Sequence, residues 1–118
     1  MVEIRVTDID KDEDANAAYI RADVIADGVK VGAVAITTDY DVENTNGAYI
    51  ERIDIDDEYQ NCGIGTATLK EISYTYGGAY AAPDNADAQR LYARLGDDIS
   101  ETDSIYAYCD QGFGVYSI

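Results

Sequence analysis

The sequence of 118 residues predicts a single α/β domain, residues 1–118, built on a mixed and mostly antiparallel β-sheet. Three observations lead to this class. Several runs in the first half alternate apolar and polar residues, as half-buried strands do. A loop with two glycines, 60–66, then stands between an apolar run and a stretch with helical spacing. A second helical pattern, 84–95, follows, so the expected strands outnumber the expected helices.

The first three strands form a meander. Val2, Ile4 and Val6 alternate with polar residues and predict a first strand, followed by an acidic connector at 8–15. Two further strands, 18–24 and 29–38, are joined by Asp27-Gly28, a strong two-residue hairpin signal.

The fourth strand is expected over 49–55, and unbroken alternation would give it two faces. Tyr49, Glu51, Ile53 and Ile55 would share one face, and Ile50, Arg52 and Asp54 would share the other.

A helix follows the glycine loop, because Leu69, Ile72 and Tyr76 recur at helical spacing. Where a strand turns through Gly63 and Gly65 into a helix, unpaired N–H groups at the positive end of the helix dipole point toward one spot. Such a turn suits an anion, although plain turn chemistry also explains it. The spacing matches neither of two common nucleotide-binding motifs, G-x-G-x-x-G and G-x-x-x-x-G-K-[ST].

The second half starts where Gly77-Gly78 ends that helix. A short fifth strand, 79–82, would run parallel to the fourth, because a helix connects them. The next helix is expected from a cap at Asp84 or Asn85 to Gly96. Two stretches, 105–109 and 113–118, would then close the chain as a hairpin, with Cys109 in a strand.

Two motifs resemble one family. Gln60-x-x-Gly63-x-Gly65 is similar to the Q/R-x-x-G-x-G/A motif of the GCN5-related N-acetyltransferases (GNAT), whose loop holds the pyrophosphate of acetyl-coenzyme A. Asn85-x-x-Ala88-x-x-Leu91-Tyr92, followed by Arg94-Leu95-Gly96, resembles a second segment of that family. The resemblance implies the GNAT acyl-CoA N-acyltransferase fold, with the fourth and fifth strands splayed around the cofactor. The usual first pair of helices is shortened or absent here, which leaves the acceptor pocket either open or completed by a partner subunit.

The resemblance also implies which residues contact acetyl-CoA. They are Ile53, Ile55, Gln60, Asn61, Cys62, Gly63, Ile64, Gly65, Thr66, Asn85 and Tyr92. The family loop usually has Arg, Lys or Gly where this chain has Asn61 and Cys62, so binding would depend on backbone dipoles. Arg90 and Lys70 are candidates for the adenosine 3′-phosphate.

Two residues are the expected catalytic pair. By the same resemblance, Tyr92 occupies the position of a tyrosine that in many family members protonates the departing thiolate. A phenol with an ordinary pKa of about 10 is protonated at neutral pH, so this role is feasible. The resemblance also implies that Glu51, on the fourth strand where several family members have a catalytic glutamate, is the general base. It would act directly or through water, if partial burial makes it basic enough. The alternatives are that Tyr92 only fills a helix face and that Glu51 is a solvated surface carboxylate.

The composition is strongly acidic, with 24 Asp and Glu against 8 Lys and Arg and a net charge of −16. This charge argues against binding nucleic acid through phosphates. It suggests the cytoplasm of a salt-accumulating halophile or of its virus-infected host, although a merely acidic mesophile protein is the alternative. No histidine is present, so no metal site is expected, and the two cysteines are expected to be buried free thiols. No apolar stretch has the length of a membrane span.

The predicted function is an N-acetyltransferase that moves the acetyl group of acetyl-CoA directly to a primary amine of a small molecule or peptide, in a ternary complex. One alternative is a non-catalytic acyl-CoA-binding or partner-binding module of the same fold. A second is an acidic decoy that mimics nucleic acid. Homodimerisation through the last strands is a further expectation.

Overall fold

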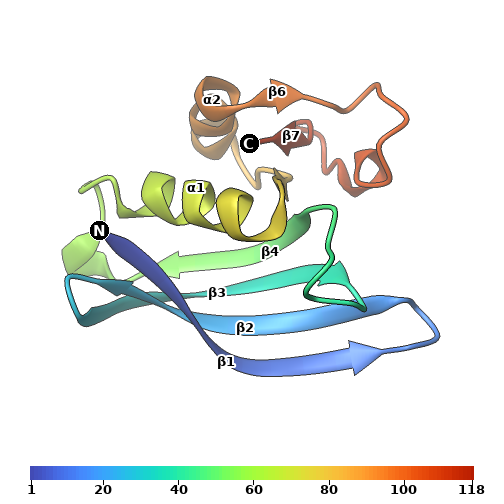
Figure 1. Cartoon of the computed structure of the whole chain (residues 1–118). Helices are drawn as coiled ribbons and strands as arrows, with labels where there is room; N and C mark the ends of the chain where they lie inside the picture. The colour runs from blue at the N-terminus through green and yellow to red at the C-terminus, as the bar shows by residue number, and fades with distance from the viewer.

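The computed structural model describes residues 1–118 and contains one seven-stranded sheet with two α-helices (Figure 1). The strand order is β1-β2-β3-β4-β5-β7-β6, in which only β4 and β5 pair in parallel. The predicted class, mixed and mostly antiparallel, is therefore confirmed. The elements are β1 Val2–Asp12, β2 Ala17–Ala26, β3 Val29–Asp39, β4 Ala48–Ile55, α1 Ile64–Tyr76, β5 Ala79–Ala81, α2 Ala86–Leu95, β6 Asp97–Asp98 and β7 Tyr116–Ser117, with short 3₁₀ helices at Asp57–Tyr59 and Ala107–Cys109.

The hydrophobic core lies between α1 and one face of the sheet. Leu69 and Ile72 of α1 are 1% and 0% exposed, and they pack with the alternating apolar residues of β2 and β3. No helix covers the opposite face of β1, β2 and β3 (Figure 1). We call this the open sheet face; its residues include Tyr19 and Arg21, which are exposed, and Thr37, which is half-buried.

β4 contains an irregularity that sequence alternation could not foresee. The register with β3 shifts between Ala35 and Ile36, so that Glu51 is an extra residue between Ile50 and Arg52. The predicted faces are therefore wrong beyond this point. Ile50, Ile53 and Ile55 pack toward the core, whereas Arg52 and Asp54 line a cavity on the opposite face with Arg21. Tyr49 pairs with Thr37 before the irregularity.

The parallel pairing of β4 and β5 is very short. Only Ala48 with Ala79 and Tyr49 with Tyr80 are paired, although β4 continues to Ile55. The two strands separate after these pairs, as the family resemblance predicted, and backbone groups of β4 face the gap instead of a neighbouring strand.

Two expected connections differ from the structure. The acidic connector at 8–15 is mostly strand, because β1 continues to Asp12 and pairs with β2 as far as Ala17. The side chains of residues 5–12 on this edge strand are exposed, so polar residues are compatible with it. A tight turn, 13–16, links the two strands in place of any helix.

The expected C-terminal hairpin does not form. Residues 107–109 are a 3₁₀ helix, and β7 pairs instead with β5 and β6. The alternation near Ile105 indicated a strand, but Ile105 and Tyr108 are 69% and 84% exposed, so neither is a core residue. Cys109 is consequently the last residue of this 3₁₀ helix instead of part of a strand, and it is half-buried. Cys62 is exposed, so the prediction of two buried thiols is wrong. Neither α-helix combines the length and the apolar character that a membrane crossing would need.

Candidate functional site

The glycine loop presents unpaired backbone donors. α1 begins immediately after Gly63, whose φ of 80° is left-handed, and no side chain caps the helix. The N–H groups of Ile64, Gly65 and Thr66 bond to no acceptor of the protein. A Cβ built at Gly63 or Gly65 would meet no atom within 4 Å, so this side of the loop is open. The loop therefore has the geometry of an anion site at a helix N-terminus.

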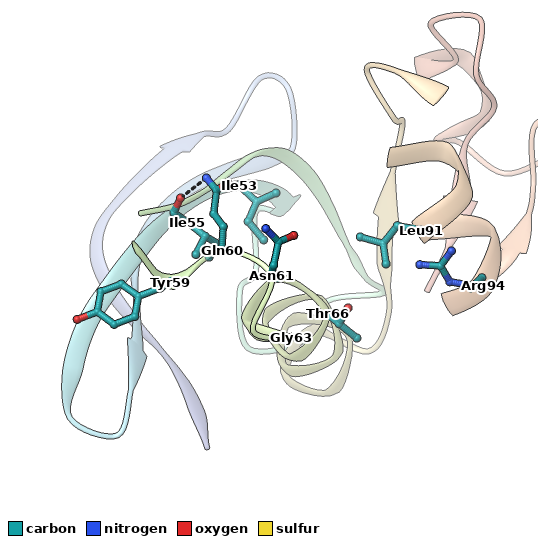
Figure 2. A pocket seen from close by; sticks show the side chains of 10 residues that line it. Ile53, Ile55, Tyr59, Gln60, Asn61, Gly63, Thr66, Leu91 and Arg94 are labelled. Carbon is teal, nitrogen blue, oxygen red and sulfur yellow. Dashed lines mark hydrogen bonds between the residues drawn. The ribbon is translucent and has the colours of Figure 1, made fainter. Parts of the chain in front are cut away.

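A cavity of about 490 Å³ lies against this loop, and we call it the loop cavity. Figure 2 shows the loop residues on one wall and Leu91 and Arg94 of α2 on the other. Gln60 closes the loop, because its Nε2 donates to the carbonyl oxygen of Ile55 at 2.9 Å and to Asp57 Oδ1 at 3.3 Å. The lining residues are Ile53, Ile55, Tyr59, Gln60, Asn61, Gly63, Gly65, Thr66, Leu91 and Arg94.

A second cavity, of about 600 Å³, occupies the region where β4 separates from β5, and we call it the strand-gap cavity. Tyr92 and Glu51 both line it, as does Asn85. Ile53 lines both cavities, so the loop cavity and the strand-gap cavity lie next to each other. The chain thus brings the proposed phosphate loop and the proposed catalytic pair to two adjoining cavities.

Tyr92 is half-buried on α2. Burial, and secondarily the nearby Asp84 carboxylate, raises the pKa of its phenol above the ordinary value. Both causes disfavour the phenolate. Tyr92 is therefore a proton donor at neutral pH, as an acid acting on a thiolate must be.

Glu51 differs from expectation in one respect, since its side chain is exposed instead of partly buried. Its Oε1 accepts a hydrogen bond of 2.9 Å from Thr37 Oγ1 of β3. The extra residue in β4 places it where the open sheet face meets the strand gap. It lines both the strand-gap cavity and a third cavity, of about 560 Å³, over the open sheet face.

Several other predicted residues have identifiable structural roles. Asn85 caps α2, because its Oδ1 accepts from Ala88 N at 2.8 Å. Ile64 packs against the core, and the Cys62 thiol lies 3.5 Å from the carbonyl oxygen of Gln60; neither residue lines a cavity. Lys70 and Arg90 also line none, and Arg90 pairs with Asp87.

A tyrosine cluster at the end of the strand gap was not foreseen. The ring of Tyr106 stacks on Tyr80 at 4.5 Å and on Tyr49 at 5.9 Å between centroids. Burial, with the Cys109 thiol and Glu51 as further causes, raises the pKa of Tyr49. Tyr106 comes from the loop after α2, where no periodic signal could have indicated it. The position of Arg94 in the loop cavity could have been found from the sequence, because Arg94 is three residues after Leu91 and therefore on the same face of the helix.

These features define a class of protein, an α/β domain with a split mixed sheet and an uncapped helix start beside the split. Residues 3–97 match the sequence model of the acetyltransferase (GNAT) family. The chain belongs to this family.

Solved structures agree on the fold. The chain is similar to a GNAT-family acetyltransferase from Staphylococcus aureus Mu50, with 18% identity, a TM-score of 0.56, and coverage of 89% of this chain and 68% of that one. It is also similar to a proposed streptothricin acetyltransferase from Bacillus anthracis, solved with acetyl coenzyme A, with 18% identity, a TM-score of 0.51, and coverage of 84% and 60%. A third is Arabidopsis thaliana Naa50 with the bisubstrate analogue CoA-Ac-MVNAL, with 20% identity, a TM-score of 0.52, and coverage of 82% and 69%. A comparison with curated protein sequences gave no significant match.

Proposed function

We propose that the protein is an acetyl-CoA-dependent N-acetyltransferase that transfers the acetyl group directly to a primary amine in a ternary complex. One observation carries this proposal: the loop cavity, beside the open start of α1, and the strand-gap cavity, lined by Tyr92 and Glu51, share the lining residue Ile53 and are therefore neighbours. A long thioester with an anionic end and a reactive end fits such a pair of cavities.

The cofactor's pyrophosphate would bind the open N–H groups of Ile64, Gly65 and Thr66. Its pantetheine arm would follow β4 past Ile53, where the missing pairing with β5 leaves backbone groups available. The thioester would then lie in the strand-gap cavity near Tyr92. Asn85 already bonds within its own helix, so its support for the arm would be indirect, through the position of α2.

The chemistry requires one base and one acid. Glu51, directly or through water, would take a proton from the ammonium, and the free amine would attack the thioester carbonyl carbon. As the tetrahedral intermediate collapses, the C–S bond breaks, and Tyr92 would protonate the departing thiolate. The nitrogen's second proton would return to the Tyr92 phenolate, directly or through water, and Glu51 would release its proton to solvent. Each acetyl transfer leaves an amide and free coenzyme A, and no acyl-enzyme forms.

The acceptor would approach over the open sheet face. The cavity there is lined by Asp8, Asp10 and Tyr19 together with Glu51, and this face has no helical cover. Carboxylates beside the entry attract a protonated amine, which favours cationic acceptors.

A non-catalytic acyl-CoA-binding module is the second candidate, and the exposure of Glu51 favours it. A solvated carboxylate is a weaker base than one held in a dry site. This candidate binds the cofactor and turns over no amine.

Titration calorimetry with acetyl-CoA in molar potassium chloride tests the proposal. Gly63→Asp would place a carboxylate in the open space of the loop and should abolish binding. Gly28→Asp is the matched control, because Gly28 also has a positive φ and open space around it but lies in the β2–β3 turn. If the wild-type protein binds acetyl-CoA, a panel of primary amines then distinguishes the two candidates. Acetylation of an amine indicates the transferase, and no turnover with any amine indicates the non-catalytic module. If the folded wild-type protein binds no acetyl-CoA at any salt concentration, the proposal is wrong.

A further inference from the structure

The loop cavity differs from every other cavity of this acidic chain. Five cavities are present, and each of the other four is lined by at least two carboxylates. The loop cavity has no Asp or Glu among its ten lining residues, although the chain contains 24 of them. It contains one formal charge, that of Arg94. A cavity so free of negative charge in a chain of net charge −16 indicates an anionic ligand.

Arg94 is also one of the few cations of the chain that are not already engaged. Four of the eight basic side chains form ion pairs with carboxylates, and Lys11 lies over the ring of Tyr40 at 4.9 Å. The ion-paired residues are Arg5, Lys30, Arg52 and Arg90. Of the remaining three, Arg21, Lys70 and Arg94, only Arg94 lines the loop cavity.

The position of Arg94 complements the loop. It lies in the last turn of α2, on the wall opposite Gly63 and Thr66 (Figure 2). A diphosphate on the N–H groups of the α1 start would therefore have backbone donors on one side and a guanidinium on the other. The loop itself supplies no cation, because Asn61 and Cys62 are neutral side chains at the two positions before Gly63.

We propose that Arg94 is a cofactor-binding residue that contacts the diphosphate of acetyl-CoA and supplies the positive charge that the glycine loop lacks. This inference rests on the proposed function, because it assigns a ligand group within the same site. A guanidinium suits the task, since its planar fork of donors can bond two phosphate oxygens at once. Its freedom from an intramolecular ion pair means that no carboxylate has to be displaced when the diphosphate binds.

The test compares Arg94→Gln with Arg90→Gln. Both variants remove one exposed positive charge from α2, but Arg90 pairs with Asp87 and lines no cavity. The probes are coenzyme A, 3′-dephospho-coenzyme A and pantetheine, titrated into each protein by calorimetry in molar potassium chloride. Arg94→Gln should weaken coenzyme A and 3′-dephospho-coenzyme A alike, by about tenfold, since a bond to a charged group is lost. Binding of pantetheine, which has no phosphate, should not change, and Arg94→Lys should restore part of the affinity.

The other outcomes would overturn the inference. If Arg94→Gln and Arg90→Gln lose the same amount of coenzyme A affinity, the loss is a general effect of removing one positive charge. A loss for coenzyme A that is absent for 3′-dephospho-coenzyme A would assign Arg94 to the 3′-phosphate. Titration with inorganic pyrophosphate distinguishes this inference from the proposed function. If pyrophosphate binds in an Arg94-dependent way but acetyl-CoA does not bind, the anion site is supported and the transferase function is rejected. Binding of neither probe by the folded wild-type protein would reject both.

Discussion

Thr37 Oγ1 donates a 2.9 Å hydrogen bond to Glu51 Oε1, across the point where the register of β3 and β4 shifts. The shift makes Glu51 the extra residue of β4, and the hydroxyl of the neighbouring strand then holds its carboxylate. Because Glu51 lines both the strand-gap cavity and the cavity over the open sheet face, this contact orients it between the expected positions of thioester and amine. A bulge that re-aims one side chain is a common device beside active sites.

Glu51→Gln is expected to lower kcat by about 10²-fold or more, because the amide cannot accept the ammonium proton. The fold should persist, since the Gln carbonyl oxygen can still accept from Thr37. Steady-state acetylation of the best amine of a panel measures the effect, with acetyl-CoA affinity as a second readout that should not change. Glu43→Gln is the control, because it makes the same charge change at an exposed residue of the loop between β3 and β4. Wild-type kcat in Glu51→Gln would remove Glu51 from the mechanism.

Tyr92→Phe should also lower kcat by about 10²-fold, while acetyl-CoA binding stays near wild type. The reason is that Phe has no hydroxyl proton to give to the thiolate. In the wild type, the raised pKa of the Tyr92 phenol keeps that proton available. Tyr74→Phe on α1, where Tyr74 is 87% exposed, is the matched control. A variant that keeps full turnover would leave Tyr92 with a packing role only.

The order of the elements could be predicted from the sequence, but the shape of the site could not. Alternation and the Asp27-Gly28 turn indicated the meander, and the two motifs located the loop and α2. Strict alternation failed at Glu51, because a bulge depends on pairing with another strand and leaves no local signal. Tyr106 was likewise missed, since its neighbours Tyr49 and Tyr80 are distant in the sequence.

Gly96→Ala is expected to destabilise the fold by at least about 1–3 kcal/mol, the usual cost of overpacking. A Cβ at this position would lie 1.9 Å from the backbone oxygen of Ser117, where α2 ends against β7. Backbone atoms cannot move aside cheaply, so the closing strands would shift. Urea unfolding in molar potassium chloride measures the change. Gly65→Ala is the contrast: its Cβ meets no atom within 4 Å, so stability should hold while coenzyme A affinity falls. Equal stability of Gly96→Ala and wild type would contradict the close packing of α2 on β7.

Salt should stabilise this protein strongly. The net charge of −16 is spread along the chain, and its self-repulsion is screened as the Debye length falls from about 10 Å in 0.1 M salt to about 3 Å in 1 M. The midpoint of thermal unfolding should therefore rise steadily with potassium chloride. An equal osmolality of a neutral solute is the control and should have a smaller effect. Identical midpoints in low and molar salt would show that the acidity is not an adaptation to salt.

Alkaline pH should destabilise the fold through its buried tyrosines. Burial is the largest cause that raises the pKa of Tyr49, Tyr76, Tyr92 and Tyr106 above the ordinary value of 10. Between the ordinary pKa and the raised one, the unfolded chain has lost protons that the folded chain retains, so the free energy of unfolding falls as pH rises. The contribution is complete below about pH 10 and disappears as pH passes the raised values. Urea unfolding at fixed salt between pH 8 and 12, with tyrosinate absorbance recorded in parallel, measures the slope. Tyr76→Phe should make it shallower, because Tyr76 is 7% exposed and burial is the cause of its shift. A free energy of unfolding that stays level through this range would contradict the burial of these phenols.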